Sequence, residues 1–328
     1  MTKGRTATLL AATIALIAMG ATAATAADPI RIAGVYRNTA DAYWVTAMCA
    51  AEKEAKKLGV ELKTFSIAVN DNTQLSQVLD AALLTQPQGL LFAPADNKTF
   101  ATKIGEIMAQ GIPVIGENPQ EPDTMWKVIQ TSQDGSLYVE PILAALAGVE
   151  GKAVVLNGLP AASAAWETQR YGAIQEALKV SNPKLEWLPE LLDNFDVTKG
   201  TQLISGTILA NPDLKVIIAS SGPGGQAAAA AVKQAGLSGQ IVVIGFDAVP
   251  AEVDALRDGT ITFLGAQGPG EVAAAQVRAL VDYIKANPEA GPVTPTHETE
   301  YLPLGLLTKD NVNDPSMVNY IYSSKCEQ

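Results

Sequence analysis

Residues 31–65 read RIAGVYRNTADAYWVTAMCAAEKEAKKLGVELKTF, and this stretch decides the fold class. Arg31–Val35 and Val60–Phe65 are short apolar runs typical of strands, and Trp44–Leu58 between them carries apolar residues at helical spacing. Two strands joined by a helix form a unit in which the strands are parallel and the helix covers the sheet.

The same alternation continues through the first half of the chain. Further strands are expected at Gly89–Ala93 and Ile112–Gly116, and further helices at Thr73–Thr85 and Thr99–Gln110, with Asn72 as the N-cap of the first.

After Lys127–Gln130 the alternation begins again. Strands are expected at Ala153–Asn157, Leu185–Leu191, Lys215–Ala219, Ile241–Phe246 and Ile261–Gly265, and helices at Ser136–Gly148, Trp166–Val180, Thr198–Ala210, Gln226–Gln234, Val249–Arg257 and Glu271–Ala286. Beyond Leu304 the chain turns polar and rich in turn residues, which indicates an extended tail. The predicted fold is α/β, with two Rossmann-like lobes that each contain a parallel sheet.

Composition agrees with two folded units and narrows the partners. The 328 residues suffice for about two domains, and 48% hydrophobic against 17% charged residues excludes disorder. The net charge is −11, and no Lys/Arg cluster is longer than Lys56-Lys57, so nucleic acid and anionic membrane surfaces are disfavoured partners. A small molecule or another protein is therefore the expected binding partner.

The first 26 residues have the pattern of a secretory signal peptide. Lys3 and Arg5 precede an apolar run from about Leu9 to Met19, and small residues end at Ala26. The run is shorter than the 18 to 20 residues, roughly, that span a bilayer, although an N-terminal anchor that is kept is the alternative. Removal of these 26 residues would leave 21 basic and 34 acidic residues, which is a net charge of −13. The expected location of the mature protein is the periplasm.

The chain has two cysteines, Cys49 in an expected helix and Cys326 in the tail. An exported protein can join such a pair in a disulfide. The simpler interpretation is one buried free thiol and one tail residue, and the sequence leaves both open.

Catalysis finds little support in the residue types. The single histidine, His297, lies between prolines with no second His or Cys at a ligand-like spacing, so we expect no enzyme activity, metal or cofactor. A two-carboxylate enzyme is the remaining catalytic alternative. A transcriptional regulator would need a DNA-binding module where the export signal lies.

Polar and aromatic residues gather just after the expected strands. In parallel sheets, ligands bind beyond the carboxyl ends of the strands, so these residues are the candidate site. The first strand is followed by Tyr36, Arg37, Asp41, Tyr43 and Trp44. Aromatic rings can stack on the C–H faces of a sugar, while carboxylates and amides bind its hydroxyls. The alternative for Trp44 is a core position at the helix start.

The later strands add further candidates. They are Glu117 and Asn118 after the fourth strand, Trp166, Thr168 and Arg170 at a helix start, Phe195 on a polar loop, Ser221 in a glycine-rich turn, and Asp247 and Gln267 after two apolar strands. The turn Ser220–Gly225 lacks the Lys-Ser/Thr end of a P-loop, which argues against phosphate binding.

Taken together, these residues resemble the ribose/galactose class of periplasmic sugar-binding proteins of ABC importers, which share a type I fold with lac-repressor-like regulators. The resemblance covers about residues 30–304 and rests on Asp41-x-Tyr43-Trp44, Pro94-Ala95-Asp96, Gly111–Ile115, Asn194-Phe195-Asp196, Gly245-Phe246-Asp247 and Ala266-Gln267. It implies an aromatic clamp of Tyr43, Trp44 and Phe195, with hydroxyl-binding groups from Asp41, Glu117, Asn118, Asp247 and Gln267.

The resemblance also implies the domain organisation and the partners. A three-strand hinge would cross near Ser132, Gln267 and Tyr301. The lobes would then comprise residues 28–132 plus 268–300, and residues 133–267 plus 301–328 with the tail. The protein is expected to be a monomer. Its expected partners are a monosaccharide or polyol and a membrane permease.

Departures from the family pattern bear on the ligand. Ala93 and Ser221 stand where ribose receptors place Asn, so the hydroxyl pattern should differ from that of ribose. A furanosyl signalling molecule and an amino acid are the alternative ligands, the latter through Arg37, Arg170 and the turn at 220–225.

Overall fold

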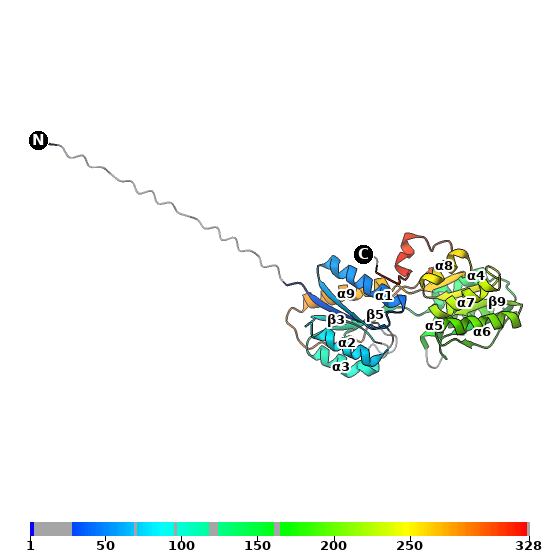
Figure 1. Cartoon of the computed structure of the whole chain (residues 1–328), viewed down its shortest axis with the longest axis horizontal. Coiled ribbons are helices and arrows are strands. Elements are labelled where there is room, and N and C mark those ends of the chain that lie inside the picture. Colours follow the sequence, from blue (N-terminus) through cyan, green and yellow to red (C-terminus); the bar gives the residue numbers. More distant parts are fainter. Residues whose placement is uncertain (3–27, 69–70, 95–96, 118–123, 161–164, 327–328) are drawn as a thin grey trace.

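The computed structural model describes residues 1–2, 28–68, 71–94, 97–117, 124–160 and 165–326, and these residues form two α/β lobes that lie side by side (Figure 1). The expected signal peptide, residues 1–26, lies almost wholly outside the described residues.

The first lobe contains a six-stranded sheet. Its strands are β1 (Arg31–Tyr36), β2 (Glu61–Ser66), β3 (Gly89–Ala93), β4 (Val114–Gly116), β5 (Lys127–Thr131) and β12 (Thr299–Leu302), in the order β12-β5-β4-β3-β1-β2. All pairs are parallel.

Four helices cover the two faces of this sheet. They are α1 (Ala42–Leu58), α2 (Asn72–Leu83), α3 (Asn97–Ala109) and α9 (Pro269–Ala286). Successive residues of β1 point to opposite faces: Ile32 packs in one core with α1 and α9, and Ala33 packs in the other with α2 and α3. Strands buried on both faces read as apolar runs, which is why the sequence reveals them.

The second lobe repeats this arrangement. Its strands are β6 (Gly151–Asn157), β7 (Leu185–Trp187), β8 (Leu191–Leu192), β9 (Leu214–Ala219), β10 (Val242–Phe246), β11 (Phe263–Ala266) and β13 (Gly305–Leu307), in the order β13-β11-β10-β9-β6-β7, with β8 also on β6. The sheet is parallel as expected except at one edge, where β13 runs antiparallel to β11.

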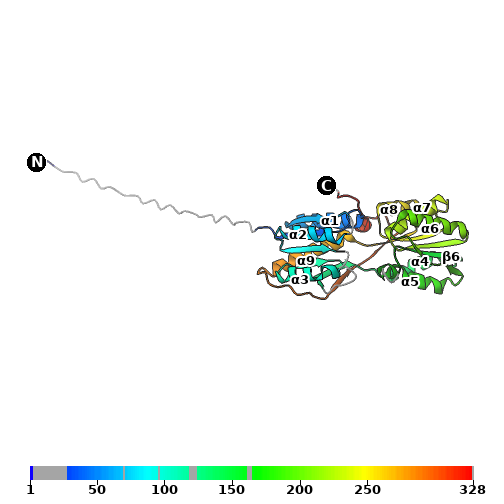
Figure 2. The same ribbon diagram turned by 60° about the horizontal axis from the view of Figure 1, so that its bottom comes forward.

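The helices of the second lobe again lie on both faces (Figure 2). They are η2 (Gly135–Tyr138), α4 (Val139–Ala145), α5 (Ala165–Ser181), α6 (Val197–Ala210), α7 (Gly222–Gln234) and α8 (Pro250–Asp258). Residues of α4 and α5 form one core with the sheet, and residues of α6, α7 and α8 form the other.

Three crossings join the two sheets, since β5, β11 and β12 are each followed by an element that belongs to the other lobe. The third crossing comes after Leu302 of β12, which pairs with Thr131 of β5. Residues 301 and 302 therefore lie in the first sheet, two residues past the boundary expected at 300. The rest of the predicted division stays a prediction.

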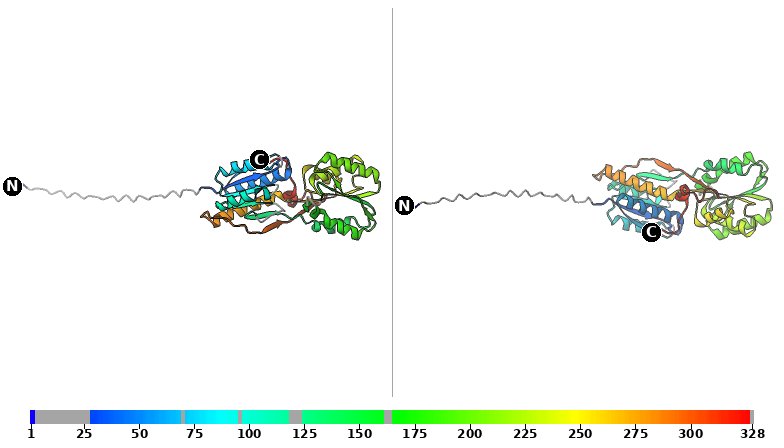
Figure 3. Two further views of the ribbon diagram at one scale, coloured as in Figure 1. Left: turned by 90° about the horizontal axis from the view of Figure 1, so that it is seen from below. Right: turned by 90° about the horizontal axis from the view of Figure 1, so that it is seen from above.

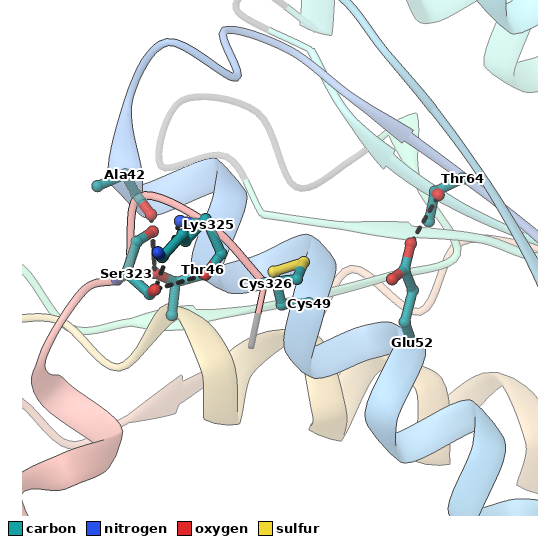
Figure 4. The surroundings of a disulfide bond; sticks show 8 residues. All are labelled: Ala42, Thr46, Cys49, Glu52, Thr64, Ser323, Lys325 and Cys326. Atoms are coloured by element: carbon teal, nitrogen blue, oxygen red, sulfur yellow. Dashed lines mark hydrogen bonds between the residues drawn. A yellow bond between two sulfur atoms is a disulfide. The ribbon is translucent and has the colours of Figure 1, made fainter. Parts of the chain in front are cut away.

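The tail does not stay with the second lobe, where the sequence places it. After β13 it forms η3 (Pro315–Tyr320), which lies where the lobes meet (Figure 3), and then returns to α1 of the first lobe. There Cys326 forms a disulfide with Cys49, with Cα atoms 5.4 Å apart (Figure 4). The simpler interpretation of two unpaired cysteines is thus wrong.

Asp41 and Asp71 start their helices as N-caps by accepting hydrogen bonds from the N–H groups of Tyr43 and Gln74. Asn72, the expected N-cap of α2, is instead the first residue of the helix, so the expected cap position was one residue too far along the chain. None of the described helices is both long and apolar enough for a membrane span.

Candidate functional site

The candidate site lies at the carboxyl ends of both sheets. In each sheet the strand order reverses beside the first strand, at β1 between β2 and β3, and at β6 between β7 and β9. Ligands of doubly wound sheets bind at such switch points. The loops after β1, β9, β10 and β11 carry five of the predicted site residues, which are Arg37, Asp41, Ser221, Asp247 and Gln267. Tyr43, Trp44, Thr168 and Arg170 lie in α1 and α5, the helices that follow β1 and β6.

Asp247 is the centre of a polar cluster in the second lobe. Its backbone has φ of 79°. Its Oδ2 accepts hydrogen bonds from the Gly222 N–H at 3.1 Å and from Arg170 Nη1 at 3.4 Å, and its Oδ1 accepts one from Gln267 Nε2 at 2.9 Å. The structure therefore brings together three predicted site residues: Arg170, Asp247 and Gln267. We call them, with Gln133, the Asp247 cluster.

Arg170 and Gln133 complete this cluster. Arg170 is 6% exposed; its Nε donates to Gln133 Oε1 at 2.8 Å, and its Nη1 donates to the Ser220 carbonyl at 2.9 Å. The Gln133 amide donates in turn to Gln267 Oε1 at 2.9 Å. Gln133 lies on the crossing between β5 and η2, so the cluster ties this crossing to the end of β11.

The first lobe presents a second group of predicted residues. The Tyr43 hydroxyl donates a hydrogen bond to Glu117 Oε2, and the Tyr43 ring contacts Trp44 edge-on with centroids 4.9 Å apart. The Arg37 guanidinium lies over the Trp44 ring, 4.8 Å from its centroid. Trp44 itself is buried in the core, as the alternative interpretation of this residue has it.

Burial raises the pKa values of two carboxyl groups here. Desolvation raises the pKa of Glu117 to about 7, against lowering contributions from Tyr43 and Arg37. Burial also raises the pKa of Asp41; the charge of Asp247 adds to that rise, and the Tyr43 N–H opposes it. Asp41 thus interacts electrostatically with the second lobe.

Tyr322 of the tail links the two groups. Its ring packs edge-on against Tyr43 at 5.6 Å, its hydroxyl donates to Asp247 Oδ1 at 3.2 Å, and its N–H donates to the Ala248 carbonyl at 3.0 Å. Tyr43 belongs to the first lobe and Asp247 to the second, so one tail residue contacts both halves of the site.

Phe195 lies elsewhere on the second lobe, and it is 37% exposed. Asn194 and Phe195 both have left-handed backbones, at φ of 59° and 58°, and the Phe195 N–H donates to Asp193 Oδ1 at 2.7 Å. The ring lies against Gly158, which follows β6. Burial raises the pKa of Asp193 to about 6.

Several predicted residues have other roles or are not described. Ser221 is the N-cap of α7, since its Oγ accepts from the Gly224 N–H at 3.3 Å. Tyr36 is 3% exposed and packs in the core. Thr168 is half-buried on α5. Asn118 and the side chain of Trp166 lie outside the described residues.

A cavity of about 360 Å³ opens beside the crossings, lined by Ser132, Gln133, Asp134, Gln169 and Tyr301. Its volume is at the lower end of the range typical of small-molecule sites. It shares Gln133 with the Asp247 cluster.

Two residues of this region, Gln133 and Tyr322, were not predicted. Gln133 directly follows the first crossing, so its place after β5 was a usable signal. The sequence signal for Tyr322 is weaker: it is an aromatic residue in a polar tail, four positions before a cysteine.

Within the described ranges, no group of three or more His, Cys, Asp or Glu side chains is arranged to hold a metal ion. The site consists of hydrogen-bonding groups and aromatic rings. Two α/β lobes whose sheets are joined by three crossings have the architecture of the type I periplasmic binding proteins.

The chain belongs to the periplasmic binding protein domain family, whose model matches residues 32–288. Two curated relatives are the D-ribose/D-allose-binding protein of Pseudomonas aeruginosa, 23% identical over 90% of this chain and 92% of the relative, and the ribose import binding protein of Salmonella typhimurium, 28% identical over 84% and 92%. The family and these relatives are binding proteins of transporters, not enzymes.

Solved structures share the fold. An ABC transporter solute-binding protein from Agrobacterium vitis, bound with α-D-tagatopyranose, is 25% identical with a TM-score of 0.71, over 90% of this chain and 99% of that one. A sugar-binding protein of a sugar ABC transporter from Bacillus halodurans is 20% identical with a TM-score of 0.75, over 86% and 99%.

Proposed function

We propose that this protein is a periplasmic receptor that binds a monosaccharide or polyol between its lobes and delivers it to the permease of an ABC importer. The observation that carries the proposal is the Asp247 cluster at the carboxyl ends of the strands, together with the aromatic pair Tyr43 and Trp44 of the first lobe. Fixed carboxylate and amide groups bind hydroxyls, and flat rings suit the C–H faces of a sugar.

The names of the similar proteins support this ligand class. The relatives above are described as ribose or allose binding, and solved neighbours hold tagatose, D-allose and D-arabinose. These ligands are neutral and rich in hydroxyls, as the polar groups of this site would require.

The arrangement of Arg170 argues against an amino acid. A ligand carboxylate would have to compete for Arg170 with Asp247, which already pairs with its guanidinium at 3.4 Å, while Arg170 also donates to Gln133 and the Ser220 carbonyl. The N-terminus of α7 is likewise occupied, since Asp247 accepts from Gly222 and Ser221 accepts from Gly224.

Receptor action follows from the three crossings. A ligand that contacts both lobes stabilises the arrangement in which they approach each other, and this arrangement is the one a permease would recognise. Export would place the protein in the periplasm, with the signal peptide removed near Ala26. There it would act as a monomer. N-terminal sequencing of the protein from a periplasmic extract tests the cleavage point.

A thermal-shift screen of sugars, polyols and amino acids tests the ligand class. A ligand at a hundred times its dissociation constant stabilises a protein by about 2.7 kcal/mol, which is easily measured. We expect sugars or polyols to raise the melting temperature, and calorimetry to show weaker binding by Asp247→Ala but not by Asp310→Ala, an exposed control in the tail. A rise with amino acids alone would contradict the proposal.

A further inference from the structure

The tail residue Tyr322 occupies the candidate site in a way that the function above does not explain. Its side chain is 3% exposed, with the ring on Tyr43 and the hydroxyl on Asp247 Oδ1. Tyr322 therefore fills the space between the two groups of site residues.

The hydrogen bonds of Asp247 show what Tyr322 does there. Oδ1 accepts from Gln267 and Tyr322, and Oδ2 accepts from the Gly222 N–H and Arg170. A carboxylate has about four lone-pair sites, and four donors therefore fill it. A ligand hydroxyl can bind Asp247 only after one of the four donors has left.

The donor that can leave is Tyr322. Gly222 is part of α7, and Arg170 and Gln267 are both bonded to Gln133 within the cluster. Tyr322 comes from a tail segment that follows η3 and belongs to neither sheet. Its displacement breaks no strand or helix.

The disulfide keeps this donor close to the site. Ser323 exchanges hydrogen bonds with the Thr46 hydroxyl at 2.7 and 3.3 Å, and Cys326 is bonded to Cys49 on the same helix (Figure 4). Four residues of extended chain reach at most about 14 Å. The covalent bond at Cys326 therefore holds Tyr322 within reach of Asp247 after it has been displaced.

We propose that Tyr322 is a specificity-determining residue of this site: its hydroxyl holds the position on Asp247 that a ligand hydroxyl takes, and a ligand is selected by its ability to replace it. The proposal rests on the sugar-receptor function above. Cys326 is a positioning residue that acts through Tyr322, because the disulfide raises the local concentration of the competing hydroxyl.

Tyr322→Phe tests the proposal, since it removes the hydroxyl and retains the ring. The probes are D-ribose, D-allose, D-arabinose and D-tagatose, titrated by calorimetry. We expect the best-bound sugar to bind the variant about tenfold more tightly, the effect of removing one competing hydrogen bond to a charged group. Differences in affinity between these sugars should shrink. Tyr320→Phe, two residues earlier on η3, is the matched control and should bind as the unaltered protein does.

The double variant Cys49→Ser/Cys326→Ser tests the tether. We expect it to bind the same sugar more tightly as well, by a smaller factor, although it loses thermal stability. Combination with Tyr322→Phe should then give no additional gain. A purely structural disulfide would lower both stability and affinity.

The outcomes separate this inference from the function on which it rests. If the unaltered protein binds a sugar and Tyr322→Phe binds it equally or more weakly, the competition by Tyr322 is refuted and the receptor function stands. If neither protein binds any of the four sugars, both are refuted for this ligand class.

Discussion

The hydroxyl of Tyr43, at the start of α1, donates a hydrogen bond to Oε2 of Glu117, just after β4. Both side chains are 9% exposed, so the carboxyl group has little contact with water. Because burial raises the pKa of Glu117 to about 7, this group takes up a proton in the folded protein at a pH where it is ionised in the unfolded chain.

This relationship predicts a pH dependence of stability. The pKa of Glu117 in the folded protein exceeds its ordinary value of 4.5, so folding is favoured by proton uptake. The stabilisation is fully present below the unfolded value and is lost as pH rises through about 7. The contribution of Glu117 to this loss amounts to about 3 kcal/mol, and urea unfolding of the unaltered protein and of Glu117→Gln across this range measures it.

Glu117→Gln is the control for this titration, since the amide keeps the shape of the side chain and carries no titratable proton. We expect the difference in unfolding free energy between the unaltered protein and this variant to decrease with rising pH. A difference that stays constant across the range would mean that Glu117 is ionised throughout.

A second prediction concerns the disulfide between Cys49 and Cys326, which are 277 positions apart. A bond that closes so long a loop restricts the unfolded chain strongly, and its loss should cost about 2–4 kcal/mol. Calorimetry should show a lower melting temperature after reduction of the unaltered protein. Cys49→Ser/Cys326→Ser should melt at that lower temperature with or without reductant. A reductant effect on the double variant would indicate another cause.

The sequence predicts most strands and helices within a few residues, because buried parallel strands are apolar runs and the helices are amphipathic. The predicted bounds are wrong for one strand and one helix that each contain a proline. The single strand expected at Leu185–Leu191 is split into β7 and β8 around Pro189, which has no N–H for the ladder. The helix expected at Ser136–Gly148 begins as η2 and becomes α4 just before Pro141, which is tolerated only in a first turn.

Contacts within the candidate site were predictable where a residue follows a strand of its own lobe. Asp247 and Gln267 end apolar strands, and the structure joins them by a hydrogen bond. Tyr322 has only a weak signal in the sequence, because its place depends on a disulfide and on a tail that returns to α1. Ser221, which is predicted for the site, serves in the structure as the N-cap of α7.

A third prediction tests whether Phe195 belongs to the ligand site. A Cβ on Gly158 would lie 2.1 Å from the Phe195 ring, so Gly158→Ala must displace the ring. We expect sugar affinity to fall by about tenfold, in line with the loss of one aromatic contact, and stability by about 1 kcal/mol. Gly206→Ala in α6 is the control, because a Cβ there meets no atom within 4 Å. Unchanged affinity of Gly158→Ala, measured by calorimetry, would remove Phe195 from the site.

A fourth prediction tests whether the packing of η2 against α5 holds Arg170 in position. Gly135, at the start of η2, lies so close to α5 that a Cβ would be 1.8 Å from the backbone carbonyl oxygen of Arg170. A backbone atom cannot rotate away, so Gly135→Ala has to shift α5 or η2 and should cost roughly 1–3 kcal/mol in urea unfolding.

The same shift moves the Arg170 guanidinium away from Asp247 and Gln133, which it contacts at 3.4 and 2.8 Å. We therefore expect Gly135→Ala to weaken sugar binding as well, by about tenfold, because the Asp247 cluster loses its alignment. Gly172→Ala is the control on α5 itself: a Cβ there has Thr168 Cγ2 at 3.9 Å as its nearest neighbour, and alanine favours the helix. Loss of stability in Gly135→Ala without loss of affinity would show that Arg170 keeps its place independently of η2.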